Sequence, residues 1–180
     1  MRSEVNDMEK GKIIFLNGVT SSGKTSIARA IQNHPGEVPY FFALSNDLFQ
    51  QMVGEKHLRE NYWDNLGQAL LMMYRTAKLF SDTGHHVIID GMLLEMNCIT
   101  EHERKMREIL ADCPLYLVLV DCPLEICRAR NFARGNRGEY QSREQAVMMA
   151  KNVAYDLCVD TSVLTSEEYA DCILTAFFEK

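Results

Sequence analysis

No run of apolar residues in this 180-residue sequence approaches the roughly 20 that a membrane-spanning helix requires. Residues 1–10 are polar and charged, so they do not have the apolar core of a signal peptide. We also find no internal repeat, low-complexity tract or linker-like segment. The sequence therefore predicts a cytoplasmic protein with no membrane partner, a flexible tail at 1–10 and a single domain at 11–180.

Metal-binding cysteine patterns and an excess of positive charge are also missing. The six cysteines, at 98, 113, 122, 127, 158 and 172, form no Cys-x-x-Cys pair, and no histidine stands at zinc-finger spacing from a cysteine pair. Reduced, mostly buried thiols are the expected state. The 19 Lys and Arg residues are outnumbered by 25 Asp and Glu, for a net charge of −6. This balance disfavours broad binding to nucleic acids or anionic membranes.

What the sequence does contain is a phosphate-binding motif. An apolar run at 12–17 leads into Gly-x-x-x-x-Gly-Lys-Thr at 18–25, and a helical pattern begins at about 23. Strand, loop and helix in this order are the context that a P-loop requires, whereas the alternative is a Gly/Ser-rich turn that happens to contain Lys-Thr. Glycines allow backbone angles that let loop amides surround a phosphate, and the helix N-terminus adds unpaired N–H groups. The predicted nucleotide-binding residues are Gly18, Val19, Thr20, Ser21, Ser22, Gly23, Lys24, Thr25 and Ser26.

Two residues of this motif have predicted chemical roles. Lys24 is expected to reach the β- and γ-phosphates of a nucleotide, and the Thr25 hydroxyl to ligate Mg²⁺. The predicted cofactors are therefore ATP and Mg²⁺.

Predicted strands and helices alternate along the chain. Strands are predicted at 12–17, 41–45, 87–90, 115–121 and 155–160, and helices at about 23–33, 48–53, 59–83, 101–111, 123–134, 142–154 and 166–178. This alternation favours an α/β fold with a parallel sheet of about five strands. Ligands of such sheets bind at the carboxyl ends of the strands. That rule gathers the P-loop with four acids, Asp47, Asp90, Asp121 and Asp160.

Two of these acids are candidates for chemistry. Asp47 follows the strand at 41–45, and we predict that it is the base that deprotonates an acceptor hydroxyl; the alternative is a helix N-cap. Asp90 ends an apolar strand, as a Walker-B carboxylate does, and is the predicted metal residue beside Thr25. Its alternatives are to orient the acceptor or to shape the turn before Gly91.

An arginine-rich segment with two glycines predicts a lid at about 130–142. Arg130, Arg134 and Arg137 are spaced by four and three, so one helical face can carry all three. Arginines over ATP neutralise charge in the transition state of phosphoryl transfer. The alternatives are a solvated basic face paired with nearby glutamates, or an RNA-binding patch, which here has no interleaved aromatic platform.

Five blocks of the sequence resemble the chloramphenicol phosphotransferase-like kinases. They are residues 11–28, Leu-Ser-Asn-Asp at 44–47, Ile-Ile-Asp at 88–90, Ala-Arg-Gly-Asn-Arg-Gly at 133–138 and Val-Asp-Thr-Ser at 159–162, in the order of that family. The resemblance implies an ATP-dependent O-phosphotransferase with a nucleoside-monophosphate-kinase-like, three-layer P-loop fold. It also implies that Asp47 is the catalytic base, that the lid arginines act in catalysis, and that the loop of Asp160 and Thr161 lies near the adenine.

We therefore expect a kinase that phosphorylates a hydroxyl of a small molecule. The stretch 48–83, where an acceptor pocket is expected, matches no block of the family, so the acceptor stays open. One alternative is a kinase of nucleosides, nucleotides or polynucleotide ends. Another is an ATP-binding switch without transfer chemistry. No nucleic-acid partner is expected, and nothing in the sequence indicates an oligomer.

Overall fold

The fold is a five-stranded parallel sheet with helices on both faces. The computed structural model describes residues 9–96, 99–135, 138 and 140–179 of the chain. The strands are β1 (Ile13–Asn17), β2 (Phe41–Ser45), β3 (His86–Gly91), β4 (Leu115–Asp121) and β5 (Leu157–Asp160), in the spatial order β2-β3-β1-β4-β5. The helices are α1 (Lys24–Gln32), α2 (Asn46–Gln51), α3 (Glu55–Glu60), α4 (Tyr62–Asp82), α5 (His102–Ile109), α6 (Leu124–Arg134), α7 (Gln141–Met148) and α8 (Ser166–Phe178). The predicted α/β fold is confirmed.

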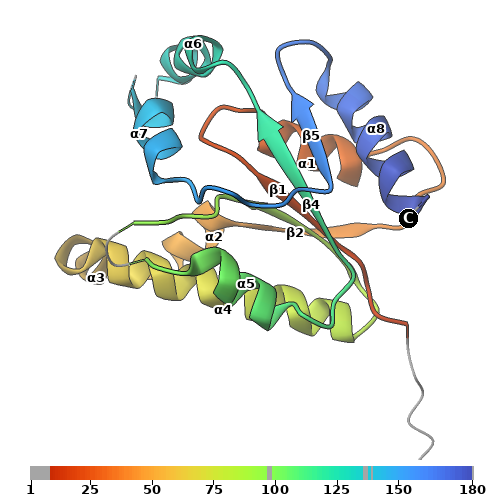
Figure 1. Ribbon diagram of the computed structural model, residues 1–180, viewed down its shortest axis with the longest axis horizontal. Coiled ribbons are helices and arrows are strands. Elements are labelled where there is room, and N and C mark those ends of the chain that lie inside the picture. The colour runs from red at the N-terminus through yellow and green to blue at the C-terminus, as the bar shows by residue number, and fades with distance from the viewer. Residues whose placement is uncertain (1–8, 97–98, 136–137, 139, 180) are drawn as a thin grey trace, which may run out of the picture.

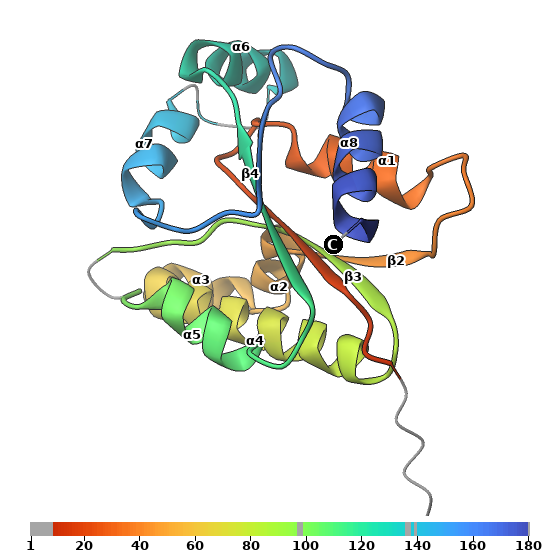
Figure 2. The same cartoon turned by 45° about the vertical axis from the view of Figure 1, so that its right-hand side comes forward.

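The core has two layers, one on each side of the central strand β1. Ile13 and Phe15 pack on the side of α4, whereas Ile14 and Leu16 pack on the side of α1 and α8. All four side chains are fully buried, which explains why the strand is apolar throughout. Figure 1 and Figure 2 show α4 and α5 against one face of the sheet and α1 and α8 against the other. None of the helices in the described part of the chain has the length and apolar content to cross a membrane.

Two predicted helices differ from the structure. The helix predicted at 59–83 is two helices, α3 and α4, because the backbone of Asn61 is not helical, with φ −141° and ψ 58°. Gly84 follows α4 with a φ of 78°, the left-handed conformation in which helices commonly end. The helix predicted at 142–154 ends at Met148, because Met149 pairs with Leu94 in an antiparallel bridge.

The start of α2 also differs from the prediction. The Ser45 backbone is extended, and its hydroxyl oxygen accepts a hydrogen bond from the amide of Leu48 at 3.1 Å. Ser45 is therefore the N-cap of a helix that begins at Asn46. The alternative interpretation of Asp47 as the N-cap is wrong, because Asp47 lies within the first turn.

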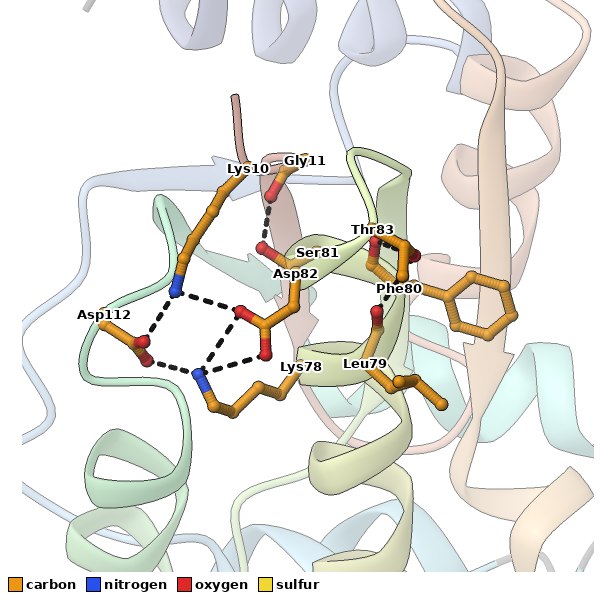
Figure 3. A network of polar contacts seen from close by, with 9 residues as sticks. All are labelled: Lys10, Gly11, Lys78, Leu79, Phe80, Ser81, Asp82, Thr83 and Asp112. Atoms are coloured by element: carbon orange, nitrogen blue, oxygen red, sulfur yellow. Dashed lines mark hydrogen bonds and ion pairs between the residues drawn. The ribbon is translucent and has the colours of Figure 1, made fainter. Parts of the chain in front are cut away.

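A cluster of four charged residues lies at the amino ends of the strands (Figure 3). Lys10 contacts Asp82 and Asp112, and Lys78 contacts the same two carboxylates. Next to the cluster, the buried Ser81 hydroxyl donates to the carbonyl oxygen of Gly11. These contacts fasten the last turn of α4 to the segments that precede β1 and β4.

Candidate active site

The P-loop connects β1 to α1, and its two glycines are required for different reasons. A side chain at Gly18 would place its Cβ atom 2.4 Å from the carbonyl oxygen of Val120, so the loop packs directly against β4. Gly23 has a φ of 109°, a conformation that other residues rarely adopt. Close packing therefore requires the first glycine, and backbone conformation requires the second.

A cavity of about 500 Å³ opens at the carboxyl ends of the strands. It is bordered by the P-loop, α1, the junction of β2 with α2, the segment that follows β3, and the helices α6 and α7. We call it the transfer cavity. Its polar and charged lining residues include Lys24, Thr25, Asp47, Asp90, Arg134 and Gln145. Residues predicted from four separate motifs, the P-loop, α2, β3 and the lid, therefore meet around one volume.

Thr25 and Asp90 form the pair expected for a magnesium site. The Thr25 hydroxyl donates a hydrogen bond to Oδ2 of Asp90 at 2.6 Å. This contact arises because β3 pairs in parallel with β1, which places Asp90 beside Leu16 at the start of the P-loop. A hydroxyl and one carboxylate fit Mg²⁺, which takes oxygen ligands and completes its shell with water and phosphate. Among the described residues there is no group of three or more His, Cys, Asp or Glu that could hold a metal by themselves.

Lys24 is folded back over its own loop. Its ammonium group donates to the carbonyl oxygen of Val19 at 2.7 Å, while its side chain also lines the transfer cavity. Asp47 faces the same cavity from the first turn of α2. The structure thus brings the predicted base and the predicted phosphate-binding lysine to one site.

The lid arginines do not share a single environment. Arg130 donates to the carbonyl oxygen of Ser21 at 3.2 Å, and to the hydroxyl and carbonyl oxygens of Thr161 at 3.1 and 2.8 Å. It therefore fastens the loop after β5 to the P-loop. Arg134 lines the transfer cavity instead. Arg137 lies outside the described residues, and Gly135 caps the end of α6 in a left-handed conformation.

A second cavity of about 290 Å³ lies on the other side of the P-loop, and Arg134 borders both. Its lining includes Ser21, Gly23, Ser26, Arg130, Thr161, Leu164 and Tyr169. Thr161 also donates its hydroxyl hydrogen to the carbonyl oxygen of Ser22 at 2.5 Å. We call this the nucleoside-side cavity, because it follows the helix-facing half of the P-loop, away from Asp47.

Asp160 and Asp121 accept hydrogen bonds from backbone amides of the loops in which they lie. An oxygen of Asp160 accepts a hydrogen bond from the amide of Ser162 at 2.9 Å, and hydrogen bonding by Ser162 lowers the pKa of this carboxyl. Asp121 accepts from the amide of Cys122 in the same way. Of the four acids that end strands or follow them, Asp47 and Asp90 are the two that line the transfer cavity.

A set of polar residues around the P-loop was not predicted. The amide of Thr20 donates to Oε1 of Gln145, on α7, at 2.6 Å. The buried Ser21 hydroxyl donates to the side-chain oxygen of Asn131 at 2.7 Å, and the Asn131 amide lies 3.4 Å from the hydroxyl of Ser142. Single amides on helices carry no sequence motif, so only the folded chain reveals these partners.

Comparison of the sequence with known proteins identifies the family. The profile of the family described as chloramphenicol phosphotransferase-like protein matches residues 11–178. A protein of Mycobacterium tuberculosis named "Putative O-phosphotransferase" is 26% identical and is aligned over 91% of this chain and 80% of its own length.

Two solved structures share the fold. The Mycobacterium tuberculosis APS kinase CysC, in complex with AMPPNP and APS, superposes with a TM-score of 0.68 at 20% identity, over 95% of this chain and 99% of that one. A gluconokinase from Sinorhizobium meliloti 1021 gives a TM-score of 0.68 at 16% identity, over 95% and 93%. The architecture is therefore that of P-loop kinases.

Proposed function

The chain belongs to the chloramphenicol phosphotransferase-like family of P-loop kinases and is an ATP-dependent kinase, and from this premise we propose that it transfers the γ-phosphoryl group of ATP to a hydroxyl of a small molecule. The observation that carries the proposal is the transfer cavity, which brings Asp47 together with Lys24 and the Thr25–Asp90 pair. Asp47 and the phosphate-binding loop line the same cavity, and its volume of about 500 Å³ leaves room for an acceptor between them.

The P-loop holds the donor in this proposal. The loop amides next to Lys24 bind the β-phosphate, and Lys24 leaves the Val19 carbonyl to contact the β- and γ-phosphates. Thr25 and Asp90 hold Mg²⁺, which neutralises charge on the phosphates when bound. The nucleoside lies in the nucleoside-side cavity, next to Ser26 and Thr161.

Asp47 and Arg134 act at the reacting group. Asp47 accepts the proton of the acceptor hydroxyl as the oxygen attacks the γ-phosphorus, while the bond from the γ-phosphorus to the β,γ-bridging oxygen breaks and ADP leaves. Arg134 borders both cavities, which supports a role in neutralising the charge of the phosphoryl group during transfer. Arg130 has a positioning role, because its hydrogen bonds hold the Thr161 loop against the P-loop. Because the donor is ATP, we place the reaction in the cytoplasm.

The acceptor half of the transfer cavity supports a small alcohol of mixed polarity. Its lining combines hydroxyl and amide groups with apolar side chains, from Ser45, Gln50, Tyr62, Leu66, Met92 and Leu94. Hydroxyl and amide groups orient a substrate by hydrogen bonds, and the apolar side chains bury its carbon skeleton. A polynucleotide end would instead call for a basic and aromatic track.

The test is a transfer assay read by mass spectrometry. Purified protein is incubated with ATP, Mg²⁺ and a panel of acceptors that includes chloramphenicol, other hydroxylated antibiotics and nucleosides. We expect one class to gain a phosphoryl group, and we expect Asp47→Asn to abolish the product while ATP binding, measured by calorimetry, persists.

Two results would contradict the proposal. If Asp47→Asn lost affinity for ATP but kept its turnover, Asp47 would be a structural or metal residue. If ATP were bound and slowly hydrolysed, with no acceptor stimulating turnover and a protein partner retained only in the ATP state, the chain would be a nucleotide-dependent switch.

A further inference from the structure

One amide of the P-loop is already occupied by a side chain from another element. The amide of Thr20 donates to the side-chain oxygen of Gln145 at 2.6 Å, and both residues line the transfer cavity. The amides of a P-loop are the groups that bind phosphate oxygens. The Gln145 oxygen therefore stands where a phosphate oxygen can bind.

The position of Thr20 indicates which phosphate this is. Thr20 lines the transfer cavity with Asp47 and Arg134, but it is not part of the lining of the nucleoside-side cavity. Gly23 and Ser26, nearer to the start of α1, line the nucleoside-side cavity instead. The Thr20 amide therefore faces the end of the triphosphate that reacts, so its natural partner is an oxygen of the γ-phosphate.

The helix that carries Gln145 is fastened at both ends. At its amino end, Ser142 contacts Asn131, which accepts from Ser21 of the P-loop. At its carboxyl end, the amide of Glu95 donates to the carbonyl oxygen of Met148 at 2.7 Å. A second backbone hydrogen bond joins Ala150 to Leu93 at 2.9 Å, and Leu94 between these two lines the transfer cavity. Helix α7 thus joins the phosphate-binding loop to the wall of the acceptor half.

We propose that Gln145 is a positioning residue that takes the place of the γ-phosphate at the Thr20 amide in the nucleotide-free enzyme and gives it up to ATP but not to ADP. The proposal rests on the proposed function, because that function places the γ-phosphate in the transfer cavity. Release of Gln145 frees one turn of α7 from the P-loop. The backbone hydrogen bonds that Leu93 and Glu95 form with the end of α7 transmit this movement to Leu94, in the acceptor half of the transfer cavity. The acceptor half therefore responds to the presence of the transferable phosphate.

The chemistry favours this exchange. A phosphate oxygen carries negative charge and forms a stronger hydrogen bond with an amide than a neutral carboxamide oxygen does. ADP ends at the β-phosphate, which binds in the loop at Lys24, so it has no group that competes for the Thr20 amide. Only ATP binding then requires the hydrogen bond between Gln145 and Thr20 to break. The free energy of breaking it lowers the affinity for ATP by about three- to tenfold.

The test compares two nucleotides on one variant. Gln145→Met removes the acceptor oxygen and keeps the length of the side chain. With Mg²⁺ present, we expect calorimetry to give a Kd for the ATP analogue AMPPNP that is about three- to tenfold lower than that of the wild-type chain, with the Kd for ADP unchanged. Val147→Met, at an exposed position of α7 that lines neither cavity, is the matched control, and both affinities should stay as in the wild type.

A second measurement follows the coupling to the acceptor wall. In the wild-type chain, AMPPNP but not ADP should alter amide hydrogen exchange at Leu93, Leu94 and Glu95, and this difference should disappear in Gln145→Met.

Three results would overturn the inference. Weaker AMPPNP binding by Gln145→Met would make Gln145 a ligand of the bound phosphate. Equal changes for AMPPNP and ADP would make it a purely structural residue. If the wild-type chain bound neither nucleotide, the proposed function itself would fail, and this result differs from the other two because it appears before any substitution is made.

Discussion

The two ends of the sheet use the same charged residue types in opposite ways. At the amino ends of the strands, Lys10, Lys78, Asp82 and Asp112 contact one another in a closed cluster (Figure 3). At the carboxyl ends, three cations and two carboxylates line a cavity of about 500 Å³. The amino-end charges hold segments of the chain together, whereas the carboxyl-end charges border the volume that the proposed function assigns to ATP and its acceptor.

The pKa values of the amino-end cluster show how strongly its charges are paired. Hydrogen bonds from Lys10 and Lys78 hold the pKa of Asp112 well below its usual range, and the same contacts raise the pKa of both lysines. The pKa of Asp82 is lowered for the same reason. The amino end therefore keeps its charges over a wide range of pH, and it depends on no ligand to do so.

The largest effect is expected from Lys24→Ala at the carboxyl end. The substitution removes the positive charge that stabilises the transferring phosphoryl group in the transition state, so turnover should fall by about a thousandfold or more. The melting temperature should stay close to that of the wild type, because Lys24 is on the cavity surface and not in the core. Mass spectrometry and thermal melts measure the two quantities, and transfer at a near wild-type rate would contradict the assignment.

The next largest effect is expected from the protonation of His102, a buried histidine at the start of α5. Nδ1 of His102 accepts from the amide of Leu94, so Nε2 carries the ring proton and donates to the hydroxyl of Tyr74. Burial lowers the pKa of His102 to about 4. The unfolded chain therefore binds the proton first as the pH falls, and the folded chain should lose up to about 3 kcal/mol of stability between pH 6.5 and 4.

Urea unfolding at a series of pH values tests this expectation. His102→Asn should flatten the pH dependence over that range, whereas His57→Asn, on the exposed surface of α3, should not. Equal slopes for all three chains would show that His102 is not the titrating group.

A smaller effect is expected from Ser45→Ala. The substitution removes the N-cap of α2 and should cost about 1 kcal/mol of stability. Because α2 carries Asp47, fraying of its first turn should also lower kcat by a few-fold and leave the KM for ATP unchanged. Thr165→Ala removes the corresponding cap of α8 and serves as the control: similar stability loss with unchanged kcat at saturating ATP. Equal loss of kcat in both variants would contradict the link between α2 and the chemistry.

The smallest effect is expected at the amino end. Asp112→Asn removes one carboxylate from an exposed cluster, so it should lower the melting temperature slightly and leave transfer unchanged. The pKa of Asp112 is lowered in the folded chain, so its contribution is present above about pH 4 and is lost as the pH falls below that value. Thermal melts of both chains should converge there and in high salt. A difference that persisted in acid would point to packing instead of charge.

The residues that could be predicted from sequence are those whose spacing is fixed by the backbone. The P-loop and Asp90 follow parallel strands, so a local motif and the rule that ligands bind at the carboxyl ends of such strands were enough to place them at one edge. Gln145 and Asn131 could not be predicted, because their contacts with the P-loop join segments more than 100 residues apart. The role of Arg130 is a similar case: its spacing predicted a shared face with Arg134, but its contact with Thr161 depends on the loop after β5.

The order of the strands has a consequence for how such kinases diverge. The P-loop and Asp90 follow β1 and β3 inside the sheet, whereas Asp47 and α2 follow β2 at its edge. Insertions and substitutions between β2 and β3 can reshape the acceptor pocket without disturbing the pairing of the inner strands. One phosphate-binding frame can therefore be adapted to new alcohols by exchanging this peripheral segment, which makes residues 46–82 the natural unit to graft between relatives.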